Sequence, residues 1–446
     1  MSTRALAREL TLPAATALVI GQVIAVGIFL TPGTMIRTVA SPLWILVVWA
    51  VMGAMAVCGA LCYGALAARY PHAGGGYVYL REAYGPRIAF LYGWKCFLVM
   101  DPGITAALAA GFASYAGYLV PLGAILTRVL GVAAIAGLAL VHIAGVRPGT
   151  RLLTALSILK LVLVGALIVA ALASATGSWS HFLPFAGRAS SAPPLAGALA
   201  GALVGAFFSF GGWWEVTKIA GEVRDPARTL PRALWIGLVG VTLVYVATTL
   251  AFIYAIPIDQ VDAGQAFVAQ VGKVTLGDAG AVAVAIVVVV CVLGSLGTML
   301  MFAPRVYYAM AQDGLFPKAA AAVHPRFGTP ARAIAIDATL ASVLVAVGQF
   351  DSIVAYFVFI TVVFIALTVF SVFVIHRRDA SFTVPGYPWT PAAFLLLVVV
   401  LLVLIALNNP LQAALGCSVV VVGWIVYQVA WRHAAVPAST VKEWSL

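Results

Sequence analysis

Charged residues are scarce in this sequence. Asp, Glu, Lys and Arg make up only 9% of the 446 residues, whereas 63% are hydrophobic and the mean hydropathy is +1.09. A soluble protein of this size would need many more polar side chains to cover its surface, so a soluble globular fold is excluded. The composition predicts an all-α polytopic membrane protein.

Motifs for metal binding or covalent catalysis are also lacking. The chain has no HExxH or CxxC pattern, and its six histidines are scattered over different segments. The cysteines lie within apolar segments, where thiols behave as small hydrophobic side chains. We therefore expect no enzyme activity, no cofactor, no metal site and no disulfide framework. The cysteines are Cys58, Cys62, Cys96, Cys291 and Cys417.

No low-complexity tract or flexible linker divides the chain, so residues 1–446 are expected to form one transmembrane domain. The N-terminal region lacks a small-residue cleavage site and leads into a full-length span, which predicts a retained first helix. A spanning helix needs about 20 mostly apolar residues, which gives about twelve spans. They are residues 13–36, 43–67, 88–119, 124–144, 152–174, 195–221, 233–255, 279–311, 333–349, 352–375, 391–408 and 411–432.

The few charges are mostly basic, with 25 Lys and Arg against 14 Asp and Glu. When the loops are assigned to alternate sides, one face receives Arg4, Arg8, Arg69, Arg81, Arg87, Arg147, Arg151, Arg224, Arg228, Arg232, Arg305, Lys318, Arg326, Arg332, Arg377, Arg378, Arg432 and Lys442. The other face has Arg37, Arg128, Arg188 and Lys273. Because basic loops mark the cytoplasmic side, we expect a multi-pass protein of the cytoplasmic (plasma) membrane with both termini in the cytoplasm. The charge is a topology signal and does not indicate a nucleic-acid partner.

Two glycine-containing breaks interrupt apolar spans, roughly half a chain apart, at residues 24–29 and 208–213. A helix interrupted at membrane depth leaves backbone amides and carbonyls that lipid cannot satisfy, whereas a buried polar solute or ion can. Two such breaks at corresponding positions of two halves point to the binding site of a transporter.

Six motifs follow one another along most of the chain. They are residues 27–32 (GIFLTP), 70–80 (YPHAGGGYVYL), 84–86 (YGP), 211–213 (GGW), 221–233 (GEVRDPARTLPRA) and 308–317 (YAMAQDGLFP). In this order they resemble the amino acid-polyamine-organocation permeases, nearest the bacterial relatives of L-type amino acid transporters. The resemblance implies a LeuT-like fold of two inverted five-helix repeats, residues 13–174 and 195–375, followed by two helices at residues 391–432.

In that fold, half-helix N-termini receive the substrate carboxylate and the other half-helix ends receive the ammonium group. The resemblance therefore implies a substrate site made of Ile24, Ala25, Val26, Gly27, Ile28, Phe208, Ser209, Phe210 and Gly211. The alternative is that these glycines only allow close helix packing. Relatives usually read Ile-Gly-Ser-Gly where this chain has residues 24–27 (IAVG), which predicts a narrower pocket and a stiffer turn.

Aromatic residues surround the second break. Phe208 and Trp213 resemble residues that close over the substrate in related permeases, so we expect them to form a gate. Packing in the helix bundle is the alternative explanation, and it applies above all to Phe210 and Trp214.

Ionisable residues at membrane depth are costly and tend to be functional. Lys160 lies in the fifth span, where sodium-independent L-type relatives carry a lysine in place of a sodium ion. Its ammonium group would tie the fifth helix to carbonyls of the first helix and remove the need for the cation. The alternative is that Lys160 snorkels to the membrane surface.

Asp101 in the third span and Glu215 and Lys218 in the sixth form a second ionisable group. Lys218 is spaced for ion pairs with Glu215 and Glu222 on its own helix. Asp101 therefore needs a partner from another helix. Proton coupling through Asp101 or Glu215 is a further hypothesis.

The loop after the sixth span suits an intracellular gate of reversible salt bridges, since Pro226 and Pro231 stiffen it. The alternative is a solvated basic loop with no mechanical role. Its charged residues are Glu222, Arg224, Asp225, Arg228 and Arg232, joined by Arg69 and Arg305 from neighbouring loops.

Taken with the resemblance, these features predict a sodium-independent, alternating-access amino acid permease or exchanger. Neither break carries a carboxylate for a cationic side chain, which favours neutral L-amino acids. We expect a monomer in the lipid bilayer, with no accessory subunit implied. The alternatives are a proton-coupled permease, a carrier of cationic amino acids or polyamines, and a non-transporting amino acid sensor of the same fold.

Overall fold

The computed structural model describes residues 6–188, 192–262, 266–347 and 350–431, and this part of the chain is helical with no β-strand. Of the basic residues used to predict the topology, Arg4, Arg432 and Lys442 lie outside the described residues. The α-helices are α1 (Leu12–Val23), α2 (Gly27–Val39), α3 (Pro42–Arg69), α4 (Gly76–Tyr84), α5 (Pro86–Lys95), α6 (Asp101–Leu119), α7 (Ala124–Ile143), α8 (Val146–Leu172), α9 (Leu195–Ser209), α10 (Pro226–Ala255), α11 (Phe267–Leu276), α12 (Gly280–Phe302), α13 (Pro304–Gln312), α14 (Ala331–Val347), α15 (Phe350–Arg378), α16 (Trp389–Asn408) and α17 (Pro410–Val426).

The prediction of a polytopic all-α membrane protein is confirmed. Ten described helical segments are long and apolar enough to cross a membrane, and the bent pair α1 and α2 makes an eleventh. Helix α14, with 17 residues, lies at the position of the ninth expected span. Each of the twelve predicted ranges therefore coincides with a helix or with a broken pair of helices.

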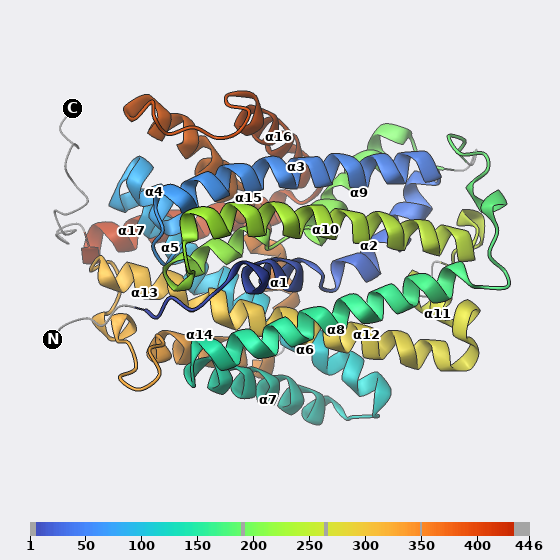
Figure 1. Cartoon of the computed structure of the whole chain (residues 1–446), viewed down its shortest axis with the longest axis horizontal. Helices are drawn as coiled ribbons and strands as arrows, with labels where there is room; N and C mark the ends of the chain where they lie inside the picture. Colours follow the sequence, from blue (N-terminus) through green and yellow to red (C-terminus); the bar gives the residue numbers. More distant parts are fainter. Residues whose placement is uncertain (1–5, 189–191, 263–265, 348–349, 432–446) are drawn as a thin grey trace.

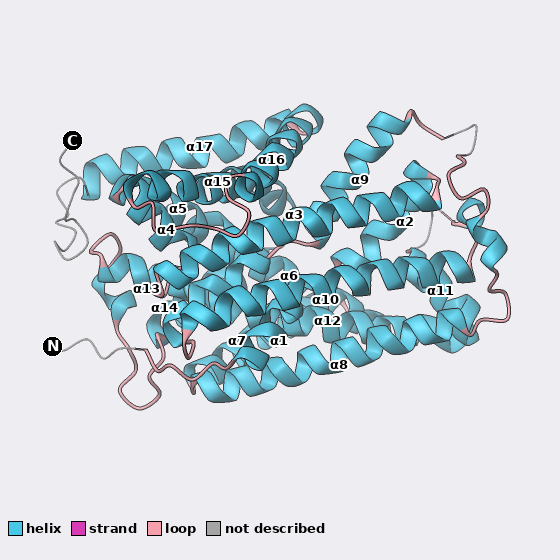
Figure 2. Ribbon diagram, turned by 45° about the horizontal axis from the view of Figure 1, so that its top comes forward, coloured by secondary structure: helices cyan, strands magenta, loops and turns pink. Residues whose placement is uncertain are grey.

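Most of these helices run along the long axis of the molecule, as Figure 1 shows. Helices α4 and α13 lie at one end, together with both ends of the described chain, and α11 lies at the other end. In Figure 2 the same helices form a bundle in which α1 lies among α8, α10 and α12. The first span is thus surrounded by helices that come much later in the sequence.

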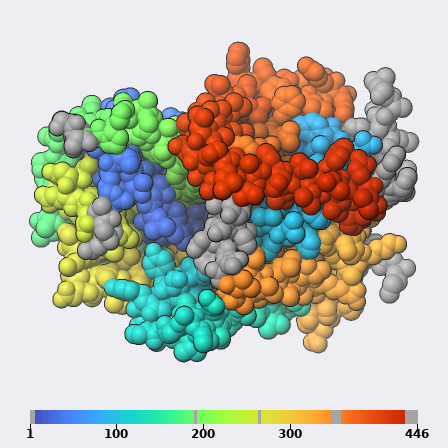
Figure 3. Space-filling model, turned by 180° about the vertical axis from the view of Figure 1, so that it is seen from behind, coloured from blue at the N-terminus to red at the C-terminus, as the bar shows by residue number. Residues whose placement is uncertain are grey.

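The last two helices stand at the edge of this bundle. Figure 3 shows α17 in red, lying across the light-blue segment that includes α5. The indole of Trp94 in α5 donates a hydrogen bond to the Val419 carbonyl of α17 at 3.1 Å, which fixes this contact. The bundle interior is formed by the earlier helices.

Candidate functional site

The first break lies between α1 and α2, which are bent by 46° relative to each other. Helix α1 ends at Val23 and α2 begins at Gly27. In the described part of the chain, the amides of residues 25–28 donate no backbone hydrogen bond. These free amides stand at the N-terminus of α2, where the helix dipole favours negative charge.

The second break follows α9, which ends at Ser209. The chain turns through Gly212, whose φ of +94° lies in the left-handed region that favours glycine, and continues as the short helix η3 (Trp213–Glu222). A Cβ added to Gly27 would lie only 2.6 Å from the Ser209 Cα. The two breaks therefore touch each other, and this contact requires a glycine on the first-helix side.

Tyr245 of α10 joins the two breaks. Its hydroxyl lies 3.0 Å from the Val23 carbonyl oxygen and 2.6 Å from the Ser209 carbonyl oxygen, so it donates its proton between the ends of α1 and α9. The side chain is completely buried. Sequence reasoning missed this residue, because a tyrosine in an apolar span carries no signal of which helices it will face.

A cavity of about 660 Å³ opens beside the two breaks. Of the predicted substrate-site and gate residues, Ala25, Val26, Gly27, Phe208, Ser209 and Gly211 line it, as does Glu215. Ile24, Ile28, Phe210 and Trp213 are buried beside the breaks and do not line it. The rest of the wall comes from Gln22, Val23, Leu30, Met100, Ile104, Ala107, Leu108, Ala110, Gly111, Ser114, Tyr115, Phe207, Gly212, Trp214, Ser295, Met299, Val358, Thr361 and Val362.

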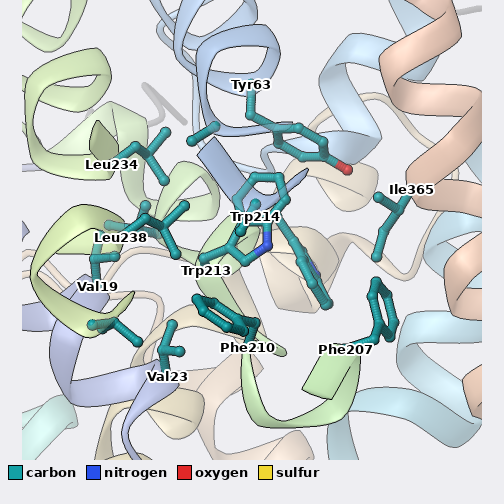
Figure 4. Packing of buried hydrophobic residues seen from close by; sticks show 14 of the residues in the cluster. Val19, Val23, Tyr63, Phe207, Phe210, Trp213, Trp214, Leu234, Leu238 and Ile365 are labelled. Atoms are coloured by element: carbon teal, nitrogen blue, oxygen red, sulfur yellow. The ribbon is translucent and has the colours of Figure 1, made fainter. Parts of the chain in front are cut away.

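The aromatic residues around the second break divide into two groups. Phe208 and Trp214 face the cavity, and Phe208 is 46% exposed. Trp213 packs edge-on against Tyr63, with ring centroids 5.2 Å apart, and Phe210 packs against Tyr245 at 5.1 Å. Figure 4 shows Trp213 and Trp214 beside each other, below Tyr63, with Phe210 directed toward Val23.

Lys160 of α8 reaches the first break. Its Nζ donates hydrogen bonds to the carbonyl oxygens of Gly21 at 2.7 Å, Ile24 at 2.9 Å and Cys291 at 3.0 Å. The side chain is completely buried, so it does not snorkel to the membrane surface in this structure. The Ser295 hydroxyl, at 3.4 Å from Nζ, completes a pocket of oxygens from α1 and α12 around the ammonium group.

These features coincide with a match to a known family. The model of the amino acid permease family matches residues 10–430. The chain belongs to this family of amino acid permeases. It lies in the amino acid-polyamine-organocation superfamily, as the sequence motifs had indicated.

Several curated relatives of the permease are amino acid transporters, and the matches cover most of their length. The serine/threonine exchanger SteT of Bacillus subtilis (strain 168) is 28% identical over 86% of this chain and 88% of that protein. The b(0,+)-type amino acid transporter 1 of Mus musculus is 27% identical over 96% and 88%. The large neutral amino acids transporter small subunit 2 of Homo sapiens is 28% identical over 96% and 82%.

A buried ionic triad lies at the cavity wall of the permease. The Lys218 ammonium contacts the Asp101 carboxylate at 3.1 Å and the Glu215 carboxylate at 2.5 Å. Lys218 thus provides the partner from another helix that Asp101 was expected to need. Of these three residues only Glu215 lines the cavity, and its carboxylate is paired with Lys218.

Two further buried ionisable residues lie near the triad. Lys95 lies over the ring of Tyr92, with Nζ 4.9 Å from its centroid. Asp337 of α14 accepts a hydrogen bond from the Tyr307 hydroxyl at 3.1 Å. Its other carboxylate oxygen is buried with no partner among the described residues. Sequence reasoning passed over Asp337, although an acidic residue within an apolar span was a readable signal.

The residues of the predicted intracellular gate form separate ion pairs in the described structure. Glu222 pairs with Arg305 through two hydrogen bonds of 2.7 and 3.0 Å, and both side chains are buried. The i,i+4 spacing had suggested an ion pair between Glu222 and Lys218, but the structure does not contain it. Asp225 and Arg228 are exposed and 3.8 Å apart.

Another residue of the predicted gate, Arg69, pairs with Asp379 at 2.8 Å. Two hydrogen bonds from Ser381, one from its side chain and one from its amide, hold the pKa of Asp379 below its usual range. This surface carboxylate is therefore ionised at neutral pH. Because both partners are partly exposed, the pair contributes little stability.

The described residues contain no group of three His, Cys, Asp or Glu side chains that could hold a metal ion. The site offers a ligand free backbone amides at one break, a largely apolar wall and a few hydroxyl and amide groups. One of these, the Gln22 side-chain oxygen, is buried without a hydrogen-bond partner in this part of the structure. This chemistry suits a small zwitterionic ligand.

Proposed function

We propose that this permease transports neutral L-amino acids across the cytoplasmic membrane by alternating access, without sodium and by exchange. The observation that carries the proposal is the position of Lys160. A covalently attached positive charge occupies a cluster of carbonyl oxygens at the first break, where an unoccupied cluster of this kind would attract a cation.

The substrate carboxylate would bind the free amides of residues 25–28 at the start of α2. The ammonium group would bind carbonyls at the end of α9, where Phe207 and Phe208 line the cavity. This arrangement orients the substrate side chain toward the α6 wall. The wall residues there are mostly apolar, which supports an uncharged side chain.

The charge distribution supports the same substrate class. Glu215 is the one carboxylate among the described lining residues, and it is already paired with Lys218. A cationic amino acid would have to displace Lys218 from Glu215 to gain an ion pair. A neutral side chain carries no such cost.

Opening and closing would involve the aromatic and ionic contacts on either side of the cavity. Phe208 is placed to cover the substrate, since it lines the cavity and is partly exposed. The buried pair of Glu222 and Arg305 would keep the opposite side closed. We assign residues 13–174 and 195–375 to the two inverted repeats, residues 391–432 to the two appended helices, and both termini to the cytoplasm.

Counterflow in proteoliposomes tests this function. Vesicles loaded with an unlabelled neutral amino acid should accumulate the labelled one, and the rate should not change when choline replaces sodium. A thermal-shift screen of the twenty amino acids identifies the substrate, because a bound ligand stabilises by mass action. Binding without accumulation would indicate a sensor, and accumulation that requires a sodium gradient would refute the role of Lys160.

Proton coupling is the second candidate. The buried residues Asp101, Glu215 and Asp337 lie near two lysines, Lys95 and Lys218, so the acidic groups outnumber the basic ones. A net buried charge is costly, which favours one bound proton in this cluster. Uptake driven by an imposed pH gradient in the wild type, and lost in Asp101→Asn, would favour this candidate over sodium-independent exchange.

A further inference from the structure

A second hollow of about 400 Å³ lies apart from the cavity, between the segment that leads into α1 and the beginning of α8. Its α8 wall consists of side chains three or four residues apart, from Arg147 to Ile158, which share one face of the helix. Residues 9–11 and Ala14 form the opposite wall. Helices α1 and α8 lie next to each other in Figures 1 and 2.

The outer end of this groove is polar and positively charged. Arg147 pairs with Glu9 at 3.0 Å, whereas Arg151 is exposed and makes no ion pair with another described residue. Between them, the Thr150 hydroxyl oxygen is buried without a hydrogen-bond partner in the described structure. Two arginines and one glutamate leave one net positive charge, which a phosphate group would complement.

The inner end of the groove is apolar and open to the side. Ala155 and Ile158 line it, and the Ile158 side chain is 58% exposed. The exposed apolar surface of α8 continues along the helix through Val162 and Val169. A soluble phosphate compound would leave this surface uncovered, whereas the acyl chain of a lipid would cover it.

We propose that this groove binds an anionic phospholipid. Its phosphate lies between Arg151 and Arg147, beside the Thr150 hydroxyl, and its acyl chain follows Ile158 along α8. The groove is charged at its outer end and apolar at its inner end, which matches the charged headgroup and the apolar acyl chain of a phospholipid. The net charge of the mouth matches the single negative charge of phosphatidylglycerol.

A lipid in this position contacts both α1 and α8, the two helices that Lys160 joins deeper in the membrane. The segment on the other wall is also fixed, because the amides of Glu9 and Leu10 donate to the Glu222 carbonyl oxygen. The bound lipid therefore stabilises the described arrangement, in which α1 packs against α8. Its effect on transport rests on the proposed function, but its binding does not.

Native mass spectrometry of the purified full-length protein tests the binding directly. Wild type should retain phosphatidylglycerol and not phosphatidylcholine. Arg151→Gln should lower the affinity for phosphatidylglycerol about fivefold, the effect of one basic residue near an anionic lipid. Ile158→Ser should also weaken it, and its exposed position leaves folding unaffected. Arg87→Gln, an exposed arginine at the start of α5 and outside the groove, is the matched control and should bind as wild type does.

Three results would overturn the proposal. They are equal affinity of wild type and Arg151→Gln for phosphatidylglycerol, equal retention of phosphatidylcholine, and displacement of the lipid by millimolar glycerol phosphate, which would assign the site to a soluble phosphate compound. Since no transport is measured, failure of the lipid site and failure of the proposed function remain distinguishable.

Discussion

Replacing Lys160 is the sharpest test of the first break. Lys160→Ala removes the ammonium group that donates to Gly21, Ile24 and Cys291. Ser295 lies 2.8 Å from the Gly21 oxygen and keeps that carbonyl satisfied, but it is 3.5 Å from the Ile24 oxygen. The variant therefore leaves mainly the Ile24 carbonyl buried without a strong donor.

An unsatisfied buried acceptor costs about 1–3 kcal/mol. This cost falls on the conformation in which α8 touches α1, and it corresponds to a change of about 5- to 150-fold in a conformational equilibrium. We expect counterflow to drop by a factor in this range. Substrate binding, measured by thermal shift, should be retained, because Lys160 does not line the cavity.

Two further variants serve as controls, one for the loss of side-chain packing at Lys160 and one for the removal of a lysine elsewhere in the protein. Lys160→Met keeps the aliphatic volume and should reproduce the transport defect with a smaller loss of stability. Lys273→Ala changes an exposed lysine at the end of α11 and should behave as wild type. Unaltered transport kinetics in both Lys160 variants would refute the reasoning, as would wild-type uptake that requires sodium.

Three further substitutions test the cavity and the closed side. Gly27→Ala should abolish the substrate-induced thermal shift, because the added Cβ meets the Ser209 backbone at 2.6 Å and separates the breaks; an unchanged shift would contradict this assignment. Phe208→Ala should raise the substrate dissociation rate with little loss of thermal stability, since the ring is half-exposed. A normal exchange rate in this variant would show that Phe208 is only a packing residue. Glu222→Gln should destabilise the protein by about 3–5 kcal/mol, because it leaves the buried Arg305 charge unpaired, and adding Arg305→Met should recover part of that loss in thermal unfolding.

Much of the helical architecture could be predicted from the sequence. The positions of the spans follow from hydropathy, because a membrane imposes a minimum apolar length on each helix. Glycines within apolar segments predicted breaks at residues 24–29 and 208–213, and the structure interrupts the helices within these ranges, at residues 24–26 and 210–212. The contact between Lys160 and carbonyls of the first helix was also expected from the family resemblance, and the structure contains it.

The direction of individual side chains could not be predicted in the same way. Trp213 and Trp214 are adjacent at the start of η3, yet only Trp214 lines the cavity. The two residues have the same hydropathy, and their positions in the sequence do not indicate which of them faces the cavity. The predicted role of Trp213 as a gate residue therefore stays a hypothesis, and Trp214 is the residue whose position favours that role.

By itself, the sequence determined which segments cross the membrane and where they are interrupted, because both depend on local composition and on glycine. Only the tertiary structure decided which distant groups meet. Lys218 pairs with Asp101 from α6, Glu222 pairs with Arg305 from α13, and Tyr245 joins both breaks. These contacts depend on the rotation of each helix about its axis. In a span that is apolar on every side, the sequence leaves that rotation open, and packing against neighbouring helices sets it.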